Sequence, residues 1–418
     1  MTNTNNSSSL GQHIYRWMIR VVLTIYYCLL TLFKIMPQKK VPKKVKILVT
    51  GTFYSDHWLI THLKPMANAS NCAQLTMVAA TEVPEINNVQ GAYAPEWLQK
   101  ITGKVGARLL YFSWIAIKER PDVLVGFHIL INGLFVALLA RLIGAKSIYI
   151  CGGGPREVQG GGIKTENRIF NRIGQADLFI ENLLLKSINT MSLIVTMGAS
   201  AINYFQEKGI TAPCEIVPGG FDDTIFCPDE NVSKIYDLIL IGRLSEIKRV
   251  DRFLLAIKKA QQILPNLNAV IVGDGPDKEA LQYLAERLEI AENIHFAGWQ
   301  NNVHEWLQKS KCFSLTSDSE GLSQALIQAM MVGVPAITSD VGDLGDLLKE
   351  GKNGYLVSPL TEDAFASAYI KFFEAQSSQF DFSKQAYQDT REFSFAQVEL
   401  HWHKIFSELQ IKNGLQRD

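Results

Sequence analysis

Two cations lie close together in the segment 241–248, which reads Ile-Gly-Arg-Leu-Ser-Glu-Ile-Lys. Arg243 follows an apolar run typical of a buried strand, and Lys248 comes just before a helical pattern. A planar guanidinium and the point charge of an ammonium can together hold a diphosphate and stabilise it as a leaving group. Either cation alone would more often be a solvated surface charge. Their shared place at a strand-loop-helix junction favours an anion-binding role.

A second segment, 318–335, places a carboxylate beside a glycine where a strand pattern gives way to a helical one. We expect Glu320 and Gly321 to end the strand and begin the helix. The amides of Gly321, Leu322 and Ser323 would then form an anion site aided by the helix dipole. A carboxylate beside such a site suits the hydroxyls of a sugar. The alternative interpretation is ordinary stabilisation of a helix N-terminus.

The elements that must position these residues alternate between short apolar runs and helical patterns. This alternation predicts a parallel sheet covered on both faces, in a first Rossmann-like domain over residues 45–213. Its strand candidates are residues 45–50, 75–80, 122–127, 146–151, 176–181 and 193–198, and segments such as 133–143 have helical length and period.

A stretch rich in Pro, Gly and Asp interrupts the alternation, and we interpret residues 214–230 as an interdomain linker. A second doubly wound domain is predicted over 231–390, followed by a C-terminal helix within 391–418. Its strand candidates are 237–244, 268–273, 293–298, 312–317 and 335–339, and its helix candidates 250–264, 276–288, 303–309 and 322–332. Two such α/β sheets create an interdomain cleft at the carboxyl ends of their strands, where ligands bind.

Composition excludes several classes of protein. A length of 418 residues fits two domains. The 41 Lys+Arg balance the 41 Asp+Glu, and this zero net charge argues against a nucleic-acid partner. The six cysteines lie far apart, with no CxxC and no His/Cys cluster at metal-binding spacing. We therefore expect no metal site and a reducing compartment.

The N-terminal segment differs from the rest of the chain. Residues 1–12 are polar, and we expect a disordered tail there. Residues 13–36 are mostly apolar, and their longest uncharged run, 21–33, is shorter than the roughly 20 residues that cross a bilayer comfortably. Residues 37–46 carry five lysines and no acid. On a helix, the polar residues fall within an arc of roughly 80°; they are His13, Arg16, Arg20, Thr24, Tyr27, Thr31 and Lys34.

A narrow polar stripe beside a wide apolar face is typical of a helix that lies in, or dips into, a lipid interface. We therefore predict a membrane-associated helix and basic linker over residues 13–44. If the helix spans instead, the lysines after it place the body in the cytoplasm, so both versions predict the cytoplasmic face of a membrane. A secretory signal peptide is disfavoured because no small-residue cleavage site follows. The alternative is a helix packed on the body or on a partner subunit.

Several motifs of the second half resemble those of one enzyme family. GRLSEIKRVDRFLLA, VIVGDGPDKEALQ, IHFAGW and SEGLSQALIQAMMVGVPAITSDVGDLGDLLKEGKNGYLV are similar, in this order, to the C-terminal domain of GT-B-fold retaining glycosyltransferases of family 4 (group 1). The resemblance is strong over residues 216–357. It implies a nucleotide diphosphate sugar as donor substrate, retention of anomeric configuration, a closing hinge between domains, and no essential metal or other cofactor.

The resemblance also implies roles for single residues. Arg243 and Lys248 would bind the donor diphosphate, and Glu320, the first acid of the family's E-x7-E pattern, would hold the transferred sugar. The second acid, which usually accepts hydrogen bonds from the ribose hydroxyls, is replaced by Gln328. An amide can still accept a hydrogen bond, and it adds donors. Smaller departures are Gly219-Gly220 in place of Asn-Gly, and Asp346 in place of Glu.

The N-terminal half is only weakly similar to the family. Gly51 and Thr52, after the first strand, resemble the loop that lies against the donor phosphates. His128, after the strand 122–127, is near the place where family members often have a histidine beside the reacting sugar; the alternative is a capped or buried structural histidine. The glycine-rich residues 151–156 and 160–164 are candidates for a flexible acceptor loop, or for glycines that only serve turns.

These features lead to one main functional hypothesis. It is a membrane-associated retaining glycosyltransferase that moves a sugar from a nucleotide sugar to a lipid-linked or membrane-proximal glycan acceptor. One alternative is a non-transferase GT-B enzyme such as a nucleotide-sugar 2-epimerase. The other is a catalytically silent binding subunit, which the replacement at Gln328 keeps open.

Overall fold

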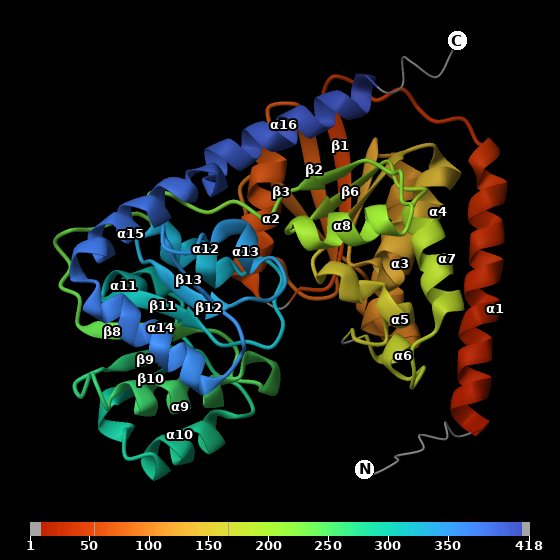
Figure 1. The fold of residues 1–418 in the computed structure, drawn as a ribbon. Coiled ribbons are helices and arrows are strands. Elements are labelled where there is room, and N and C mark those ends of the chain that lie inside the picture. The colour runs from red at the N-terminus through yellow and green to blue at the C-terminus, as the bar shows by residue number, and fades with distance from the viewer. Residues whose placement is uncertain (1–9, 54, 166, 412–418) are drawn as a thin grey trace. The chain divides into compact units, whose positions relative to one another are not determined.

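The computed structural model describes residues 10–53, 55–165 and 167–411, with the backbone alone at 376–380. The chain forms two compact units (Figure 1). The first comprises the chain up to Gly220 together with the stretch from Val398 onward, and the second is Phe221–Gln397. Each unit is built around a parallel sheet with helices, which confirms the predicted α/β fold class.

The sheet of the first unit has the strand order β3-β2-β1-β4-β5-β6-β7. The strands are β1 (Val45–Thr50), β2 (Cys72–Ala79), β3 (Val89–Tyr93), β4 (Val123–Phe127), β5 (Lys146–Cys151), β6 (Leu193–Thr196) and β7 (Cys214–Ile216). The chain moves from β1 out to β3, returns to β4 and then moves the other way. Because crossovers between parallel strands are right-handed, this reversal places helices on both faces and creates a switch point between β1 and β4.

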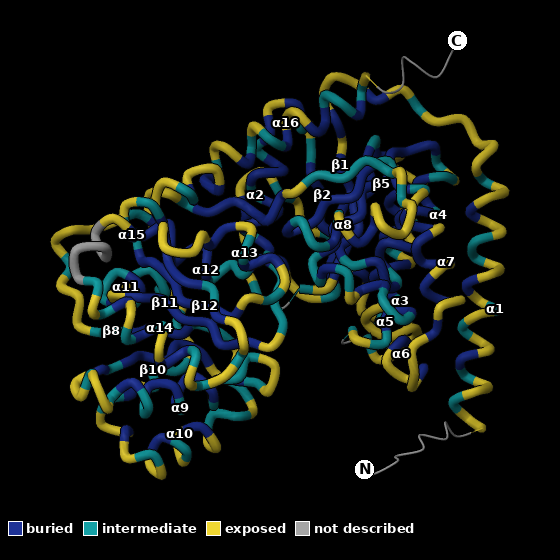
Figure 2. Tube along the Cα trace, in the orientation of Figure 1, coloured by how far each residue is buried: buried dark blue, intermediate teal, exposed yellow. Residues whose placement is uncertain are grey.

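Helices cover this sheet: α2 (Asp56–Asn68), α3 (Glu96–Glu119), α4 (Leu134–Ile143), α5 (Gln159–Gly162), α6 (Arg168–Asn171), α7 (Leu178–Ile188) and α8 (Ala199–Glu207). On one face, Leu48, Val78 and Leu124 of the central strands pack against Phe112 of α3 and Val136 of α4. All five side chains are buried, and Figure 2 shows the sheet as the buried centre of the unit. The buried strands give the loops at their carboxyl ends a rigid support.

The second unit repeats this plan with the strand order β10-β9-β8-β11-β12-β13. Its strands are β8 (Tyr236–Ile241), β9 (Ala269–Val272), β10 (Ile294–Gly298), β11 (Ser310–Leu315), β12 (Ala336–Ser339) and β13 (Gly354–Val357). Its helices are α9 (Val250–Ala260), α10 (Lys278–Arg287), α11 (Val303–Gln308), α12 (Gln324–Met331), α13 (Leu344–Leu347), α14 (Glu362–Glu374) and α15 (Gln376–Asp389). Here the direction reverses between β8 and β11, which are parallel neighbours.

The first unit differs from the prediction in three places, one of which is the edge strand β3, which was not among the strand candidates. The run 176–181, predicted as a strand, instead begins α7, because the Asp177 carboxylate accepts hydrogen bonds from the N–H groups of Phe179 and Ile180 and caps the helix. The predicted linker, 214–230, begins inside the sheet, because Cys214–Ile216 is β7 and pairs with β6. Short apolar runs do not distinguish a buried strand from the start of a buried helix.

The last helix, α16 (Phe395–Ile411), lies within the segment 391–418, whose residues 412–418 are outside the described part of the chain. From Val398 onward α16 belongs to the first unit. There Asn68 donates a hydrogen bond to Glu399, and His401 Nε2 lies 3.1 Å from a Glu215 carboxylate oxygen. The chain therefore returns to its first unit at its C-terminal end.

The N-terminal helix α1 (Leu10–Leu32) is followed by the 3-10 turn η1 (Phe33–Ile35). It begins inside the segment predicted as a disordered tail, so Leu10–Gln12 are helical, and residues 1–9 lie outside the described residues. By length and composition alone, Leu10–Ile35 could cross a membrane. Figure 1 shows α1 running alongside α7 in the first unit, so one side of the helix packs on the body of the protein.

Candidate functional site

The predicted cations and acid of the second unit follow the two strands that flank its switch point. Arg243 and Lys248 follow β8, and Glu320 follows β11. The structure brings two of the three together, because Lys248 Nζ lies 2.6 Å from Glu320 Oε1. The Ser317 hydroxyl donates to the same oxygen at 2.6 Å. The Glu320 side chain is 9% exposed and that of Lys248 is 23% exposed, so this ion pair is only partly screened by solvent.

Arg243 is exposed and makes no hydrogen bond or ion pair with any described residue. It lies between Gly242 and Leu244, whose carbonyl groups are closely covered by the loop after β9. A Cβ at Gly273 would overlap the Gly242 carbonyl oxygen, and a Cβ at Gly275 would overlap that of Leu244. The two glycines therefore let the loops pack backbone to backbone and leave the Arg243 guanidinium available to an anion.

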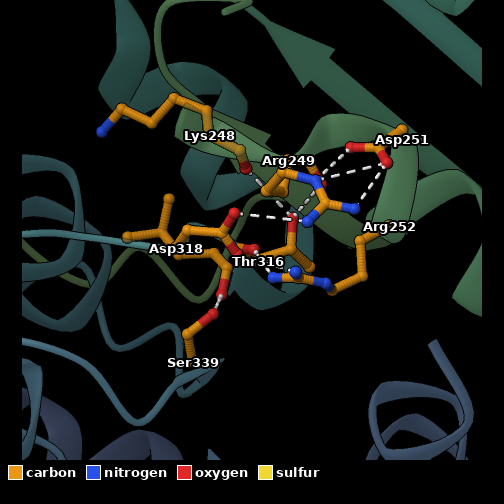
Figure 3. Close-up of polar contacts among 8 residues, drawn as sticks. Lys248, Arg249, Asp251, Arg252, Thr316, Asp318 and Ser339 are labelled. Atoms are coloured by element: carbon orange, nitrogen blue, oxygen red, sulfur yellow. Dashed lines mark hydrogen bonds and ion pairs between the residues drawn. The ribbon is translucent and has the colours of Figure 1, made fainter. Parts of the chain in front are cut away.

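A network that the sequence analysis did not anticipate braces the loop after β11. Arg252, which is 5% exposed on the buried side of α9, donates to the Thr316 carbonyl at 2.6 Å and to Asp318 at 2.7 Å. Arg249 also donates to Asp318, at 3.2 Å, and to Asp251 (Figure 3). Burial would raise the pKa of Asp318, but its hydrogen bonds and proximity to these two guanidinium groups lower it below the usual range.

The loop after β8 joins the same network. The Thr316 hydroxyl donates to the Arg249 carbonyl at 2.8 Å, and the Asp318 N–H donates to the Ile247 carbonyl at 3.0 Å. In Figure 3 the Lys248 ammonium points away from Arg249 and Asp318. Thus the arginines fix the two loops, and Lys248 is left to pair with Glu320. A sequence signal existed for Arg252, because an arginine on the apolar side of an amphipathic helix needs a buried partner.

The helix predicted over 322–332 begins two residues later than expected, so Glu320 and Gly321 do not open it. Glu320, Gly321 and Leu322 lie in a loop, Ser323 is the N-cap, and α12 begins at Gln324. The Ser323 side chain accepts a hydrogen bond from the Leu326 N–H, which is the usual way in which serine starts a helix. The amides of Gly321, Leu322 and Ser323 are therefore loop amides rather than donors of the first helical turn.

Gln328 lies on α12 and is 4% exposed. The Glu320 loop is held from another side by the turn after β12. Gly342 has φ +58°, and a Cβ there would overlap the Glu320 carbonyl oxygen. A residue with no side chain is thus required at position 342 if Glu320 is to keep its place.

In the first unit, the predicted residues again follow the strands that flank the switch point. Gly51 and Thr52 follow β1, and His128 follows β4. Arg108 of α3 connects these two loops: it donates to the Gly51 carbonyl, to the Thr52 hydroxyl at 3.1 Å and to Asn132 Oδ1 at 2.6 Å. Arg108 is 2% exposed, and burial lowers its pKa to about 10.

The Arg108 Nε atom has no hydrogen-bond partner within the described part of the chain. Since Asn132 also donates to the Phe127 carbonyl at 2.8 Å, the guanidinium ties the end of β1 to the end of β4. The sequence analysis missed Arg108, which lies in a helix with several exposed apolar residues and has no recognisable motif around it.

His128 is held by a buried carboxylate. Its Nδ1 lies 2.8 Å from Glu157 Oε1, and its backbone has φ +62°. Glu157 also accepts hydrogen bonds from the Gly153 N–H (2.6 Å), the Ile129 N–H (2.8 Å) and the Tyr149 hydroxyl (2.8 Å). Burial would raise the pKa of Glu157, but the His128 ring and the two N–H donors lower it. This arrangement directs Nε2, the other ring nitrogen, away from the carboxylate.

An aromatic ring, that of Trp58, also faces His128. The Trp58 ring is nearly parallel to the His128 ring, with centroids 6.4 Å apart, and it stacks on His62 at 4.0 Å. His62 is buried, and burial lowers its pKa to about 4. The glycines at 160–162 all have positive φ, and Gly161 and Gly162 are buried, so they serve a packed turn rather than a flexible loop.

Comparison with known proteins agrees with these observations. Residues 226–389 match the family model of the glycosyl transferases group 1. The chain is 30% identical over 243 residues to the O-antigen biosynthesis glycosyltransferase WbnH of Escherichia coli, a match that covers 58% of this chain and 64% of WbnH. Matches to this and the other first curated relatives cover less than two thirds of their lengths.

Solved structures share the fold of the chain. HepE of Anabaena, in complex with UDP, has a TM-score of 0.67 over 87% of this chain and 100% of its own, at 16% identity. Sucrose-phosphate synthase of Thermosynechococcus elongatus has a TM-score of 0.70 over 88% and 100%, at 13% identity. Residues 226–389 are therefore similar to the glycosyl transferases group 1, and the two parallel sheets of the chain have the GT-B fold.

Proposed function

We propose that the protein is a retaining glycosyltransferase of the family 4 type that uses a nucleotide diphosphate sugar as donor. The observation that carries this proposal is the ion pair between Lys248 and Glu320 at the switch point of the second unit, with Arg243 exposed on the neighbouring loop. A cation pair and a carboxylate at the carboxyl ends of adjacent parallel strands suit a ligand that carries both a diphosphate and sugar hydroxyls.

When the donor binds, contacts within the protein would be replaced by contacts between the protein and the donor. Arg243 and Lys248 would bind the diphosphate and stabilise the negative charge that builds on it as it leaves. Glu320, released from Lys248, would accept hydrogen bonds from the transferred sugar. Gln328 would contact the ribose through its amide. No metal is invoked, because these two cations supply positive charge at the diphosphate.

The first unit would serve the acceptor and the reacting sugar. Front-face attack, with the leaving phosphate taking the acceptor proton, requires no protein base. His128, whose Nδ1 is held by Glu157, would orient the sugar through Nε2. Gly51 and Thr52, fixed by Arg108, would present backbone and hydroxyl groups to the donor phosphates.

The acceptor we propose is a lipid-linked or membrane-proximal glycan in polysaccharide or glycolipid biosynthesis. The relative WbnH is named for O-antigen biosynthesis, and an apolar N-terminal helix is present. We place the protein at the cytoplasmic face of a membrane, where nucleotide sugars are made and the lysines of residues 37–46 would meet anionic headgroups.

Thermal-shift screening of UDP- and GDP-sugars, followed by transfer of labelled sugar to membrane lipid extracts, tests the proposal. We expect one donor to stabilise the protein and to label the extract. Arg243→Ala and Glu320→Ala should abolish transfer, whereas Arg287→Ala, at an exposed arginine of α10, should not. Donor binding without transfer to any acceptor would favour a silent binding subunit, the alternative that Gln328 supports.

A further inference from the structure

We propose that α1 binds an anionic lipid surface lying flat, with its outer apolar face in the bilayer interface, and that it does not cross the bilayer. This inference deepens the membrane association in the proposed function and rests on that part of it. The side of α1 that contacts the protein includes the buried Arg16, Leu23 and Leu30. Most of the polar stripe, namely His13, Arg20, Thr24, Thr31 and Lys34, is exposed at the edge of this contact, and another side of the helix carries exposed apolar residues.

The inner side of α1 is docked along its length. Leu23 and Leu30 are buried in the core cluster that contains residues of α4 and α7, and Arg16 is also buried. The Tyr15 hydroxyl donates to the Ile169 carbonyl, and the Tyr26 hydroxyl donates to the Leu134 carbonyl, both at 2.9 Å. These contacts span more than two helical turns, so the whole helix is a layer of the first unit.

An ion pair fixes the register of this docking. Arg20 Nε donates to Asp177 Oδ2 at 2.9 Å, and the Asp177 side chain has no exposed surface. The other Asp177 oxygen caps α7 through Phe179 and Ile180. If α1 left the body to cross a bilayer, Asp177 would lose its cation, and Arg20 would enter or border the hydrocarbon. Both consequences are costly.

The outer side of α1 is a continuous apolar stripe. Its exposed residues recur every three or four positions, as they do along one face of a helix; they are Ile14, Trp17, Met18, Val22, Ile25, Leu29 and Leu32. Figure 2 shows this side of α1 as largely exposed. A soluble protein rarely leaves a stripe of this length open to water, so it marks an interaction surface.

The stripe continues onto neighbouring segments. Ile169, Leu178 and Phe179 are exposed beside the N-terminal half of α1, where Tyr15 contacts Ile169 and the Arg20 guanidinium lies 5.6 Å from the centre of the Phe179 ring. We name α1 and these three residues the apolar platform. It is wider than a single helix, which is a property of an in-plane surface rather than of a spanning segment.

Charge identifies the partner of the apolar platform as an anionic bilayer. Exposed cations lie in the segments that adjoin the platform along the chain: Lys164, Arg168 and Arg172 around Ile169, and Lys34, Lys40, Lys43 and Lys44 after α1. Residues 1–55 contain eight Lys+Arg and no acid, in a chain of zero net charge. Among the described residues of 10–46 and 164–179, the one acid is the buried Asp177. Exposed cations of this kind attract anionic headgroups to an apolar centre.

Protease access distinguishes a flat helix from a spanning one. The full chain with an epitope before Met1 is added to preformed vesicles of phosphatidylcholine and phosphatidylglycerol, and proteinase K is then added without detergent. We expect loss of the epitope together with digestion of the body, because both lie on the outer side. Protection of the epitope until detergent is added would overturn the proposal.

Matched substitutions test the platform itself. Trp17 and Trp97 are 64% and 62% exposed, the first on α1 and the second on α3. Trp17→Glu should lower the vesicle-bound fraction about tenfold in co-sedimentation, and Trp97→Glu should leave it unchanged. An equal loss in both variants, or no loss in Trp17→Glu, would overturn the assignment. A wild-type chain that does not bind vesicles and is a dimer, together with a monomeric Trp17→Glu variant, would overturn the proposal by showing that a second copy covers the platform.

Donor binding keeps this test separate from the proposed enzymatic function. Trp17→Glu should retain the thermal shift produced by the donor, because Trp17 is an exposed residue of α1 and none of the proposed donor-binding residues lies on that helix. If no nucleotide sugar binds any variant but the vesicle results are as expected, the enzymatic proposal fails and the platform stands. If the donor binds but the wild-type chain does not bind vesicles, the platform proposal fails and the enzymatic proposal stands.

Discussion

Lys248 Nζ and Glu320 Oε1 are 2.6 Å apart, and this one ion pair joins the loops that follow two adjacent parallel strands, β8 and β11. The two residues are 72 positions apart in the chain. In the proposed donor site each would need a different partner, the lysine a phosphate and the acid a sugar. The pair must therefore open when a donor binds, and substitutions that weaken it should separate nucleotide binding from sugar transfer.

Glu320→Gln should produce that separation. Without the carboxylate, Lys248 loses its partner and becomes available to a diphosphate, so we expect UDP to bind as tightly as before or a few-fold more tightly. Transfer should fall about 100-fold, because the sugar loses a charged acceptor of its hydrogen bonds. Calorimetry with UDP and initial rates with the donor measure the two effects. Glu286→Gln, at an exposed acid of α10, is the control, and unimpaired transfer in Glu320→Gln would contradict the assignment.

Alanine substitutions at two glycines distinguish the effect of displacing Glu320 on transfer from the effect of backbone strain. Gly342 and Gly351 have φ values of +58° and +71°, so the positive φ alone should make alanine destabilise the fold by about 1 kcal/mol at either position. A Cβ at Gly342 would overlap the Glu320 carbonyl oxygen, whereas one at Gly351 meets nothing within 4 Å. We expect Gly342→Ala to lower transfer at least about tenfold.

The Gly351→Ala control should retain transfer. Urea denaturation measures the stability of each variant, so that the transfer rates can be corrected for any unfolded fraction. Equal losses in the two alanine variants would mean that strain, rather than displacement of Glu320, explains the effect.

Stability should depend on pH through His62. Its pKa is about 4 in the folded protein because it is buried, against about 6.5 in an unfolded chain. The unfolded state therefore binds an extra proton between these values, and the stability of the folded state falls as the pH is lowered from 6.5 to 4. The loss from this group is about 3 kcal/mol.

Denaturation curves of the wild type and His62→Phe across this range measure the slope that His62 contributes. The variant can have a different stability at pH 7, so the comparison uses slopes alone. Parallel pH dependence in the two proteins would show that His62 is not buried in its neutral form.

Glu157 should set the tautomer of His128. Because a carboxylate accepts from Nδ1, we expect the Nδ1–H form, which nitrogen-detected NMR of the labelled protein can identify. Glu157→Gln should change this signal and lower stability by about 1 to 3 kcal/mol, since the amide presents N–H groups to buried donors. Glu157→Asp is the matched variant that keeps the charge. Unchanged His128 resonances in Glu157→Gln would contradict a positioning role.

The same carboxylate contributes to acid stability with a definite sign. The pKa of Glu157 is lowered in the folded protein, so its stabilising contribution is fully present above the unfolded value of about 4.3 and is lost as the pH falls through the folded pKa. The Glu157→Gln variant has no carboxylate to protonate at this position, so its stability should fall less steeply with decreasing pH. Denaturation of the variant and the wild type at pH values below 5 measures this difference.

The sequence predicts much of this protein because its strands are short, apolar and regularly spaced. The α/β class and the residues after β8 and β11 follow from that alternation and from the local motifs. Arg108, Glu157 and Arg252 could not be placed in the same way, because their partners come from distant segments. Arg108 meets Gly51 and Asn132, 57 and 24 positions away. The helix predicted from residue 322 begins instead at Gln324, because the Ser323 side chain caps it.

Sequence periodicity also left the orientation of the N-terminal helix undecided. It identified a narrow polar stripe on α1 correctly, but the stripe alone does not say whether water, headgroups or protein lies against it. The structure shows that protein covers only part of the stripe: Arg16 is buried and Arg20 pairs with the buried Asp177, 157 positions away, whereas Thr24 and Thr31 are exposed. Long-range ion pairs of this kind are invisible to a pattern of local hydrophobicity.

Hydrogen exchange of the full chain with and without saturating UDP or GDP tests the central claim most directly, because it maps the nucleotide without assuming an acceptor. We predict slower exchange in peptides that cover 242–249 and 317–328, and loss of this protection in Arg243→Ala but not in Arg287→Ala. If both nucleotides leave these two loops unprotected, or protect only other parts of the chain, the donor site proposed around Arg243, Lys248 and Glu320 is wrong.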